Sequence, residues 1–276
     1  MFLESKDFFE NGKKTEFGLV LSGGASRGMA HIGVFKYLEE NNLIPSEIAG
    51  TSIGAFFGSL YAFSYTSLQM EEIIKDLKYV NIIDFDFKTG LISGKKAIKS
   101  MKNIFGNSLI EDAKIPLRII ATDIDSGEKI VFEKGKVVEA LRASMGVPGL
   151  VAPYRHDGRN LVDGGIMNNL PIQEISLDKV IAVSVARDIK MKIKTENSFF
   201  GLNFNKTFIG ISYQILKKSI DIMKIENEKR ALDSNKKIIL VHPKFTKSDY
   251  DFKRYKEVIK FGYNETKKML AIENIK

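Results

Sequence analysis

The sequence predicts an α/β fold with three layers, in which helices cover both faces of a central, mostly parallel sheet, and it predicts a helical C-terminal region. Short apolar runs bounded by glycine or polar residues alternate along the chain with segments whose apolar residues recur at helical spacing. One run, VIAVSVARD at residues 180–188, is almost continuously apolar, as is typical of a strand covered on both faces. Strands that alternate with helices favour a parallel sheet with helices on each side.

The length and composition allow one sizeable hydrophobic core. The chain has 276 residues, of which 44% are hydrophobic and 28% charged, and no strong linker divides it. We therefore expect a single domain over residues 1–276. We expect its core at about residues 16–187, and a basic, mostly helical C-terminal extension at residues 188–276 that completes the fold.

The first expected elements follow from periodicity and turn residues. The run FGLVLSGG predicts a strand at residues 17–21 that ends in a tight glycine turn, and apolar residues at helical spacing follow in residues 26–42. A short strand is expected at residues 48–49. Ser67 is expected to cap the amphipathic helix of SLQMEEIIKDLKYV, and residues 93–106 predict another short helix.

The later elements alternate in the same way. The segment PLRIIATDIDSGEKIVFEKG predicts two strands joined by a turn at residues 125–127. Residues 137–149 predict a helix that Pro148 stops. After the strand at residues 180–188 we expect a long helix at residues 208–232, a strand in KIILVHP and a final helix at residues 252–272. Residues 197–208 are expected to be the most exposed or mobile segment.

The composition excludes several kinds of site. There is no cysteine, so a disulfide, a thiolate nucleophile and a cysteine-based metal site are all impossible, which fits a reducing compartment. Glu4, Lys6 and Asp7 interrupt the apolar residues near the N-terminus, and no secretory signal is visible. We therefore expect a cytoplasmic location, either free or peripheral at the inner face of the membrane.

The net charge of +8 is unevenly distributed. Residues 190–276 carry 20 Lys and Arg against 10 Asp and Glu, whereas the first 189 residues carry 22 against 24. A basic C-terminal third fits an anionic membrane, nucleic acid or an acidic partner, and it equally fits a solvated lysine-rich surface. Because it contains no recognisable nucleic-acid-reading motif, we expect no nucleic-acid partner.

A glycine-rich loop, SGGASRG at residues 22–28, lies between the first expected strand and the first expected helix. Glycines allow backbone N–H groups to point at a ligand there, and the following helix adds positive potential at its N-terminus. Such a loop can bind a phosphate or a developing oxyanion, and a plain tight turn is a third interpretation. Ala25 replaces a glycine that the dinucleotide pattern G-x-G-x-x-G requires, and no P-loop sequence is present.

Residues 50–54, Gly-Thr-Ser-Ile-Gly, match the nucleophile-elbow pattern G-x-S-x-G between an expected strand and an expected helix. The glycines allow a sharp turn that exposes the Ser52 hydroxyl at a helix N-terminus, where negative charge is favoured. The same residues lie in an uncharged run, residues 48–70, that is long enough to cross a bilayer. Gly50, Gly54 and Gly58 even have the spacing of some membrane helices. The many Ser and Thr residues of the run, and the lack of a Lys or Arg cluster before it, favour a strand, a turn and a buried helix instead.

The Ser52 hydroxyl needs a base that accepts its proton. The imidazole candidates are His31, His156 and His242. The order Ser52, Asp163, His242 matches the triad order of α/β-hydrolases, although ILVHPK is more simply interpreted as the end of a strand. Asp163 is also a candidate functional residue, because it ends an expected strand, where α/β sheets place their ligand sites. The sequence Asp-Gly is also a common turn pair.

Together, the glycine loop, the serine elbow and Asp-Gly-Gly resemble the patatin-like phospholipase family, in its bacterial, neuropathy-target-esterase-like branch. The resemblance is carried, in this order, by SGGASRGMAHIGV, IAGTSIGA, ATDIDSGEKIVFEKG, ALRASMGVPGLVAPY and VDGGIMNNLP, and it covers about residues 16–187. It implies a patatin-like α/β/α fold and a Ser–Asp dyad without a catalytic histidine. Ser52 would be the nucleophile and Asp163 the base.

The resemblance also implies an oxyanion hole at the glycine loop. Gly23, Gly24 and Ala25 would supply its N–H groups, and Arg27 would lie beside them. The family often has a third glycine where this chain has Ala25; alanine keeps its N–H, so the hole requires a local backbone conformation that accepts a Cβ. His31 matches a histidine that is frequent in the family, and we expect it to pack and brace the loop.

The implied function is that of a serine esterase or lipid acyl hydrolase, which cleaves carboxylic ester bonds of phospholipids or lysophospholipids through an acyl-enzyme. We expect no cofactor and no metal. The apolar residues Phe199, Phe200, Leu202 and Phe204 next to the basic third predict peripheral contact with anionic lipid, or alternatively a loop packed on the core. A non-catalytic lipid- or anion-binding module and a Ser-His-Asp esterase of another hydrolase class stay open as alternatives.

Overall fold

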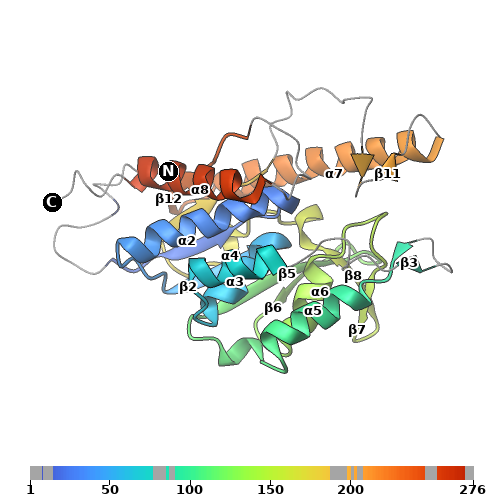
Figure 1. Cartoon of the computed structure of the whole chain (residues 1–276), viewed down its shortest axis with the longest axis horizontal. Coiled ribbons are helices and arrows are strands. Elements are labelled where there is room, and N and C mark those ends of the chain that lie inside the picture. The colour runs from blue at the N-terminus through green and yellow to red at the C-terminus, as the bar shows by residue number, and fades with distance from the viewer. Residues whose placement is uncertain are drawn as a thin grey trace.

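A mixed eight-stranded sheet forms the centre of the protein, and helices flank it (Figure 1). The computed structural model describes residues 8, 15–76, 85–86, 91–186, 198–199, 202–203, 208–245 and 254–270. The parallel strands are, in spatial order, β12 (Lys237–Val241), β9 (Lys179–Val183), β1 (Gly18–Leu21), β2 (Glu47–Thr51) and β5 (Leu117–Asp123). The antiparallel strands are β6 (Lys129–Phe132), β7 (Tyr154–His156) and β8 (Arg159–Asp163). The predicted mostly parallel sheet is confirmed.

The helices alternate with these strands as expected. The α-helices are α2 (Ala30–Glu40), α3 (Ile53–Ala62), α4 (Ser67–Asp76), α5 (Lys95–Phe105), α6 (Val137–Ser144), α7 (Phe208–Leu232) and α8 (Tyr255–Leu270). The 3₁₀ helices are η1 (Ala25–Met29), η3 (Ile110–Asp112), η4 (Gly164–Ile166) and η5 (Ile172–Glu174). Two small antiparallel pairs lie outside the main sheet: β3 (Phe85–Asp86) with β4 (Leu91–Ile92), and β10 (Ser198–Phe199) with β11 (Leu202–Asn203).

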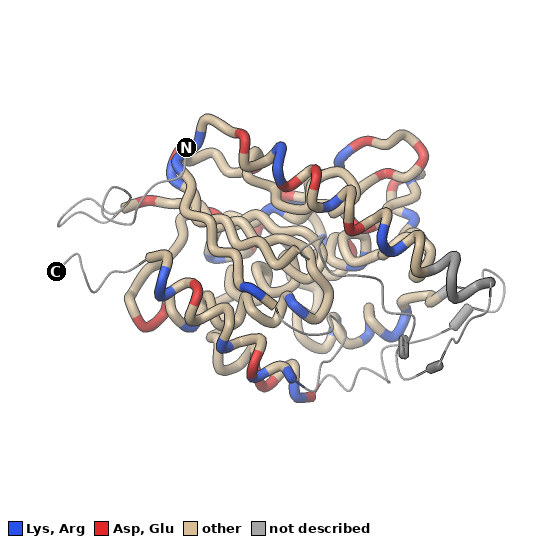
Figure 2. Tube along the Cα trace, turned by 90° about the horizontal axis from the view of Figure 1, so that it is seen from above, with Lys and Arg blue, Asp and Glu red and all other residues tan. Residues whose placement is uncertain are grey.

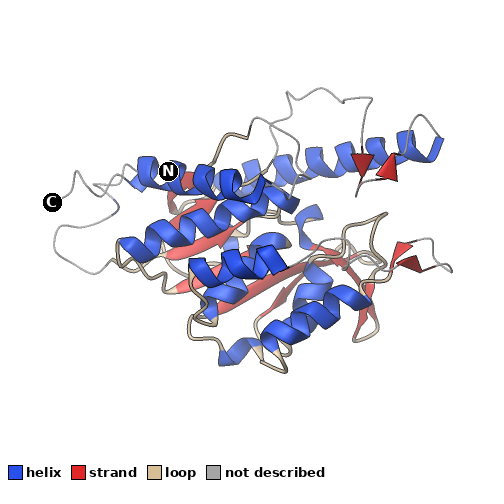
Figure 3. Cartoon of the chain, viewed as in Figure 1, coloured by secondary structure: helices blue, strands red, loops and turns tan. Residues whose placement is uncertain are grey.

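The side chains of the strands divide the core between the two faces of the sheet. In β1, Leu19 and Leu21 belong to a cluster with residues of α2, α3 and α8, whereas Val20 belongs to a separate cluster. That second cluster includes Ile172 of η5 and Ala231 near the end of α7. Because successive side chains of a strand point to opposite faces, the two clusters are the two sides of a three-layer α/β/α arrangement. Figure 3 shows the helices of the first cluster in front of the strands.

The C-terminal region contributes to both the sheet and a helical layer. β12 extends the sheet beside β9, and α8 lies along α2 (Figure 1). A Cβ on Gly33 of α2 would lie 2.0 Å from the Ile259 carbonyl oxygen, and one on Gly262 of α8 would lie 2.0 Å from the Ala30 carbonyl oxygen. The two helices therefore approach each other at a backbone distance that only glycine permits.

The uncharged run at residues 48–70 is divided among several elements. It contains the end of β2, the ten-residue helix α3 and the start of α4. Over the described residues, we find no helix with both the length and the apolar character that crossing a bilayer requires. The alternative interpretation of this run as a membrane span is thus wrong, because the chain turns at both ends of α3.

Two predicted helix ends need correction. α4 is capped by Thr66 rather than by Ser67: the Gln69 N–H donates to Thr66 Oγ1 at 3.3 Å, and the Thr66 N–H donates to Gln69 Oε1 at 2.9 Å, which is the reciprocal pattern of a capping box. α6 ends at Ser144, ahead of the predicted stop at Pro148. The Gly146 carbonyl is already outside the helix, where it accepts the Asp163 N–H at 2.8 Å.

Charged residues lie mainly on the outer helices and loops, and the central strands carry few of them (Figure 2). Buried charged side chains are therefore exceptions that need a physical explanation. They include Arg27, Asp163 and Glu228.

Candidate active site

Ser52 occupies a strained turn between β2 and α3. Its backbone angles are φ 56° and ψ −124°, and its relative exposure is 7%. A serine in this conformation costs about 1–3 kcal/mol, and such residues persist where the surrounding structure holds them. Gly54 is part of that structure, because a Cβ there would lie 2.3 Å from the Leu21 carbonyl oxygen. The sequence prediction of a sharp strand–turn–helix at this serine is confirmed.

Hydrogen bonds from two other segments hold the turn. The Ser52 N–H donates to Ser144 Oγ at 2.8 Å, and the Thr51 hydroxyl donates to the Asn168 carbonyl oxygen at 2.8 Å. Neither of these bonds uses the Ser52 hydroxyl. Among the described residues, no protein group accepts a hydrogen bond from that hydroxyl.

Asp163 reaches the serine because two strands meet end to end. Ile119 and Ile120 of β5 pair with both β2 and β6, whereas Ala121 and Thr122 pair with both β6 and β8. A strand has only two edges, so β2 and β8 must share the edge of β5 that β6 leaves open. β2 runs parallel to β5 and β8 runs antiparallel to it, so their carboxyl ends approach each other.

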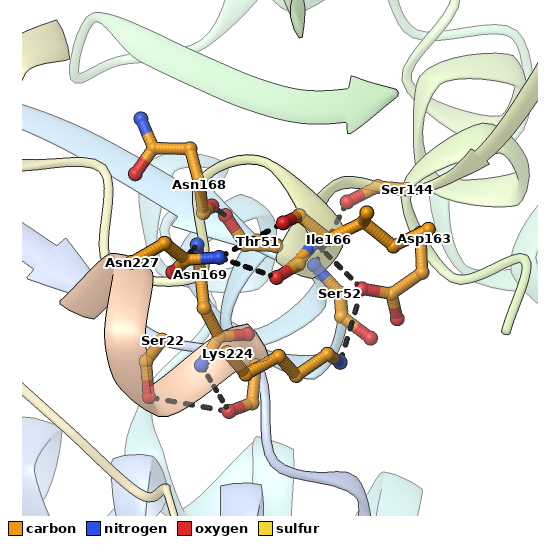
Figure 4. Close-up of polar contacts among 12 residues, drawn as sticks. Ser22, Thr51, Ser52, Ser144, Asp163, Ile166, Asn168, Asn169, Lys224 and Asn227 are labelled. Carbon is orange, nitrogen blue, oxygen red and sulfur yellow. Dashed lines mark hydrogen bonds and ion pairs between the residues drawn. The ribbon is translucent and has the colours of Figure 1, made fainter. Parts of the chain in front are cut away.

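The register makes this meeting close. Thr51, the last residue of β2, lies opposite Ile120, and Asp163, the last residue of β8, lies opposite Ala121. In Figure 4 the side chains of Ser52 and Asp163 point toward one another. The sequence argument placed Asp163 at the end of a strand, and the structure confirms that position. β8 is antiparallel to β5, and its end-to-end contact with β2 brings Asp163 to the serine turn.

The two carboxylate oxygens of Asp163 have different surroundings. The side chain is almost completely buried, at 1% exposure. Oδ1 accepts the Gly165 N–H at 2.8 Å and a hydrogen bond from Lys224 Nζ at 3.2 Å. Oδ2 is buried and has no hydrogen-bond partner among the described residues. A buried acceptor without a partner is costly in a finished core, and it is what a site that awaits a proton donor would contain.

The glycine loop lies directly against the serine. A Cβ added to Gly23 would lie 3.1 Å from Ser52 Cβ. The Gly23 N–H donates to the Asn169 carbonyl oxygen and the Arg27 N–H donates to the Gly24 carbonyl oxygen, both at 3.3 Å. Within the described parts of the chain, the N–H groups of Gly24 and Ala25 donate to no backbone carbonyl outside the helices and strands. Of the four residues predicted for an oxyanion hole, these two therefore have N–H groups that are available to a ligand.

Ala25 adopts a conformation that glycine normally occupies. Its φ is 52°, in the left-handed region, and its side chain is exposed. An L-residue with a Cβ pays roughly 1 kcal/mol there. The backbone thus accepts the alanine, with strain and without a steric clash of its methyl group against a buried neighbour.

His31 braces the glycine loop from below. It is fully buried, and its Nε2–H donates to the Ser22 carbonyl oxygen at 3.0 Å. Burial lowers the pKa of His31 to about 4, against the smaller opposing effect of the bond to Ser22. The ring is therefore neutral at physiological pH, in agreement with the predicted bracing role.

The other histidines lie away from Asp163. His242 follows β12, which β9 and β1 separate from β2, and its Nδ1 donates to the Ser184 carbonyl oxygen at 3.0 Å. His156 ends β7 and lies near Glu139 and Asp157. The open alternative of a Ser52, Asp163, His242 triad is thus contradicted, because three strand spacings of nearly 5 Å each separate β12 from β2.

Arg27, which was predicted to lie beside the oxyanion hole, contacts the C-terminal region. Its side chain is buried, and its guanidinium carbon lies 5.9 Å from the centre of the Phe245 ring.

The predicted lipid contact lies outside the described residues, which do not include the side chains of Phe199, Phe200, Leu202 and Phe204. Where the chain is described, no three carboxylate or imidazole groups converge to hold a metal ion.

The sequence analysis missed three residues of α7 that contact the site. Lys224 pairs with Asp163, and Asn227 Nδ2 donates to the carbonyl oxygens of Gly165 and Ile166 at 2.8 and 3.0 Å. Glu228 is buried and accepts hydrogen bonds from Asn169 Nδ2 and from Ser184 Oγ (Figure 4 labels Lys224, Asn227 and Asn169). The signal that the sequence offered is their spacing: residues 224, 227 and 228 are three and four positions apart, which puts them on one face of the predicted helix. Polar residues with this spacing are also common on helix faces that contact solvent.

Asn169 connects Glu228 to the glycine loop. Its Nδ2 donates both to Glu228 and to the Gly23 carbonyl oxygen, the latter at 3.1 Å. Because the peptide bond is planar and trans, this bond also aims the Gly24 N–H to the side opposite Asn169. Burial raises the pKa of the Glu228 carboxyl, against the opposing effect of these hydrogen bonds.

Comparison with known proteins places this site in a family. Residues 19–175 match the family model described as patatin-like phospholipase. An uncharacterized NTE family protein of Mycobacterium tuberculosis is 33% identical over 191 residues, which cover 64% of this chain and 53% of the relative. Lysophospholipase NTE1 of Candida albicans is 35% identical over 178 residues, which cover 61% and 13%. Patatin-like phospholipase domain-containing protein 6 of Homo sapiens is 34% identical over 192 residues, which cover 66% and 14%.

Solved structures with the same fold are more distant in sequence. VipD from Legionella pneumophila has a TM-score of 0.59 at 15% identity, over 95% of this chain and 67% of that protein. The type III effector protein ExoU has a TM-score of 0.51 at 12% identity, over 94% and 53%. The match spans about half the length of the mycobacterial relative and a smaller share of the fungal and human ones. Since the family model covers more than half of the sequence, this chain belongs to the patatin-like phospholipase family.

Proposed function

We propose that this protein is a serine hydrolase that cleaves acyl ester bonds of phospholipids or lysophospholipids, with Ser52 as nucleophile and Asp163 as base. Membership of the family supports the hydrolase class, and a relative named as a lysophospholipase supports the substrate class. The observation that carries the proposal is the end-to-end meeting of β2 and β8, which puts a strained serine opposite a buried carboxylate.

The proposed reaction has two steps. In the first, Ser52 Oγ attacks the ester carbonyl carbon while its proton passes to Asp163, and the alcohol leaves with that proton. In the second, a water molecule attacks the acyl carbonyl carbon while its proton passes to Asp163. The bond to Ser52 Oγ then breaks, the fatty acid leaves, and Asp163 returns the proton to Ser52 Oγ. Oδ2 of Asp163 is the proposed acceptor, because Oδ1 already accepts two hydrogen bonds.

The glycine loop would stabilise the tetrahedral intermediates. The N–H groups of Gly24 and Ala25 are the proposed donors, since they lie in the loop that contacts Ser52 and have no other backbone acceptor among the described residues. Fixed donors of this kind are worth about 10²–10³-fold in rate each. Ester carbonyls are easier acyl donors than amides, so an aspartate can serve as base where a protease would need an imidazole.

The test is hydrolysis of p-nitrophenyl butyrate by the wild type and by Ser52→Ala and Asp163→Asn, together with labelling by a fluorophosphonate probe. We expect both variants to lose at least about 1,000-fold in kcat/KM and Ser52→Ala to lose labelling. His156→Ala, a change at the far edge of the sheet, serves as the matched control and should retain activity.

Two results would change the conclusion. Folded Ser52→Ala protein with wild-type turnover would overturn the proposal. A wild type that binds phospholipid vesicles but is neither labelled nor active would support the alternative of a non-catalytic lipid-binding module.

A further inference from the structure

Helix α7 brings a cation to the proposed base. Lys224 Nζ lies 3.2 Å from Asp163 Oδ1, and the two side chains are 15% and 1% exposed. Figure 4 shows the lysine extending from α7 toward the space between Ser52 and Asp163. Removing one partner of an ion pair this far from water leaves a buried charge without compensation, whereas the exposed pairs of the same helix contribute little.

The lysine approaches only one of the two carboxylate oxygens. Oδ1 receives both Lys224 and the Gly165 N–H, whereas Oδ2 stays without a partner among the described residues. Two donors on one oxygen fix the rotation of the carboxylate about its Cβ–Cγ bond. The unoccupied oxygen is then held in one direction.

The lysine side chain is itself held in place by the second glycine of Asp-Gly-Gly. A Cβ on Gly165 would lie 2.4 Å from Lys224 Cε and 2.7 Å from Nζ, so the side chain lies directly on the backbone of that residue. A side chain at this position would press on the end of Lys224 and also on Asn169 Oδ1, which would lie 2.6 Å from the added Cβ, and we expect it to displace the ammonium group from Asp163. The glycine therefore makes room for a residue that lies 59 positions further along the chain.

We propose that Lys224 is a positioning residue for Asp163: its ammonium group binds Oδ1, so that Oδ2 is the oxygen available to the Ser52 hydroxyl. This inference rests on the proposed function. Removal of the cation would leave the buried carboxylate without its ion-pair partner and with one donor fewer to fix its rotation.

The charges around the pair are few. Asp221 and Glu228 lie one turn before and one turn after Lys224 on α7. Glu228 interacts electrostatically with both Lys224 and Arg27. Among the described residues, Lys224 is the only cation in an ion pair with Asp163.

The test compares Lys224→Met, which keeps the length of the side chain without its charge, with Lys224→Arg, which keeps the charge. The pH dependence of kcat and KM for p-nitrophenyl butyrate is measured for each. We expect Lys224→Met to lose about 100-fold in kcat at pH 6 with a KM within about twofold of the wild type. Its acid limb should move upward by at least about one pH unit, so that part of the loss is recovered in alkali. Lys224→Arg should restore most of the rate.

Two further variants serve as an independent test and as a control. Gly165→Ala leaves the lysine in the chain but displaces it, and it should shift the acid limb in the same direction. Lys229→Met removes an exposed lysine of the same helix, 65% exposed, and should match the wild type in rate and pH profile.

The outcomes separate this inference from the proposed function. If the wild type depends on Ser52 but Lys224→Met keeps an unshifted acid limb, with or without a loss of rate, the positioning role is overturned and the dyad stands. If the wild type shows neither turnover nor fluorophosphonate labelling, both are overturned. If Lys224→Met is too unstable to measure, an unshifted acid limb in Gly165→Ala overturns the positioning role.

Discussion

The region up to residue 186 and the region from residue 208 contribute to the site in different ways. The first contains every sequence block that resembles the family, and it supplies the strained serine, the buried aspartate and the glycine loop. The second contains no recognised motif, yet its helix α7 supplies a lysine, an asparagine and a glutamate that hold the aspartate and the loops. The motifs identify residues that need an unusual backbone conformation. The charged side chains around those residues are supplied by whichever helix packs against them.

The two regions are also joined in two different ways. On one face of the sheet, α8 meets α2 by close approach of backbones at Gly33 and Gly262. On the side of the site, α7 is joined to the loops by buried polar bonds, such as those of Glu228 with Asn169 and Ser184. The first junction should be sensitive to side-chain volume and the second to the loss of polar partners.

The largest effect is expected at the glycine junction. Gly33→Leu would place a side chain where the Ile259 carbonyl oxygen now lies, and separating the helices would open the core beneath them. We expect the free energy of unfolding in urea to fall by about 3 kcal/mol or more. Gly262→Leu should cost a similar amount, since it blocks the same crossing from the other side.

The two glycines should also be coupled. Gly33→Ala and Gly262→Ala each force the helices apart, so the double variant should lose less than the sum of the single losses. A Gly33→Leu protein as stable as the wild type would show that the regions are not joined at this crossing.

The next effect concerns the buried histidine of the first region. His31 has its pKa lowered by burial from 6.5 to about 4 in the folded protein, so the unfolded chain takes up a proton over this interval and the folded one does not. The stability that the neutral ring contributes is complete above pH 6.5 and is lost as the pH falls through 4. Relative to His31→Gln, the wild type should lose about 3 kcal/mol between pH 7 and pH 4. Parallel pH profiles of wild type and His31→Gln would contradict the assignment.

The polar junction of the second region should show a smaller effect. Glu228→Ala removes the acceptor of both Asn169 Nδ2 and Ser184 Oγ, so the Ser184 hydroxyl loses its acceptor and Asn169 Nδ2 keeps only its bond to the Gly23 carbonyl oxygen. We expect a loss of about 2 kcal/mol in urea unfolding. Glu226→Ala, at an exposed position of the same helix with a 52% exposed side chain, should change the stability by less than about 0.5 kcal/mol. Equal effects of the two variants would show that the buried network does not join the regions.

The contribution of Glu228 to stability should depend on pH in the opposite direction to that of His31. Burial raises the pKa of Glu228 in the folded protein above the ordinary 4.5, so its contribution is present below pH 4.5 and is lost as the pH rises through the folded value. The neutral analogue Glu228→Gln should therefore gain stability relative to the wild type as the pH rises from 4 to 8. Thermal unfolding at several pH values measures this difference, and a constant or falling difference would contradict it.

The smallest effect is expected at Ala25. Its left-handed backbone suits glycine, so Ala25→Gly should relieve strain and raise the free energy of unfolding by up to about 1 kcal/mol. The N–H that we propose as an oxyanion donor is kept, so kcat with p-nitrophenyl butyrate should stay within about twofold. A clear destabilisation would mean that the alanine side chain makes a contact that outweighs the strain.

Most elements of the fold follow from the sequence. The boundaries of α7 agree with the expected helix at residues 208–232, and β5 with β6 forms the expected hairpin. The errors lie at helix ends, where Thr66 competes with Ser67 for the cap and where α6 ends at Ser144, four residues before Pro148. At such positions neighbouring residues offer similar local chemistry, and small differences in tertiary contacts decide between them.

The sequence by itself determined the alternation of strands and helices and the turn at Ser52, because periodicity and turn chemistry depend on near neighbours in the chain. The pairing of Ser52 with Asp163 as candidates followed from the resemblance of the sequence blocks to the family. Only the tertiary structure decided that β2 and β8 meet end to end along β5, that the Gly23 and Arg27 N–H groups are already bonded, and that Lys224 and Glu228 face the site. These features depend on which edge of a strand is occupied and on which helix covers the site. They result from packing between segments that are distant in the sequence. The neighbours of a lysine or a glutamate in a helix do not indicate which distant segment it will contact.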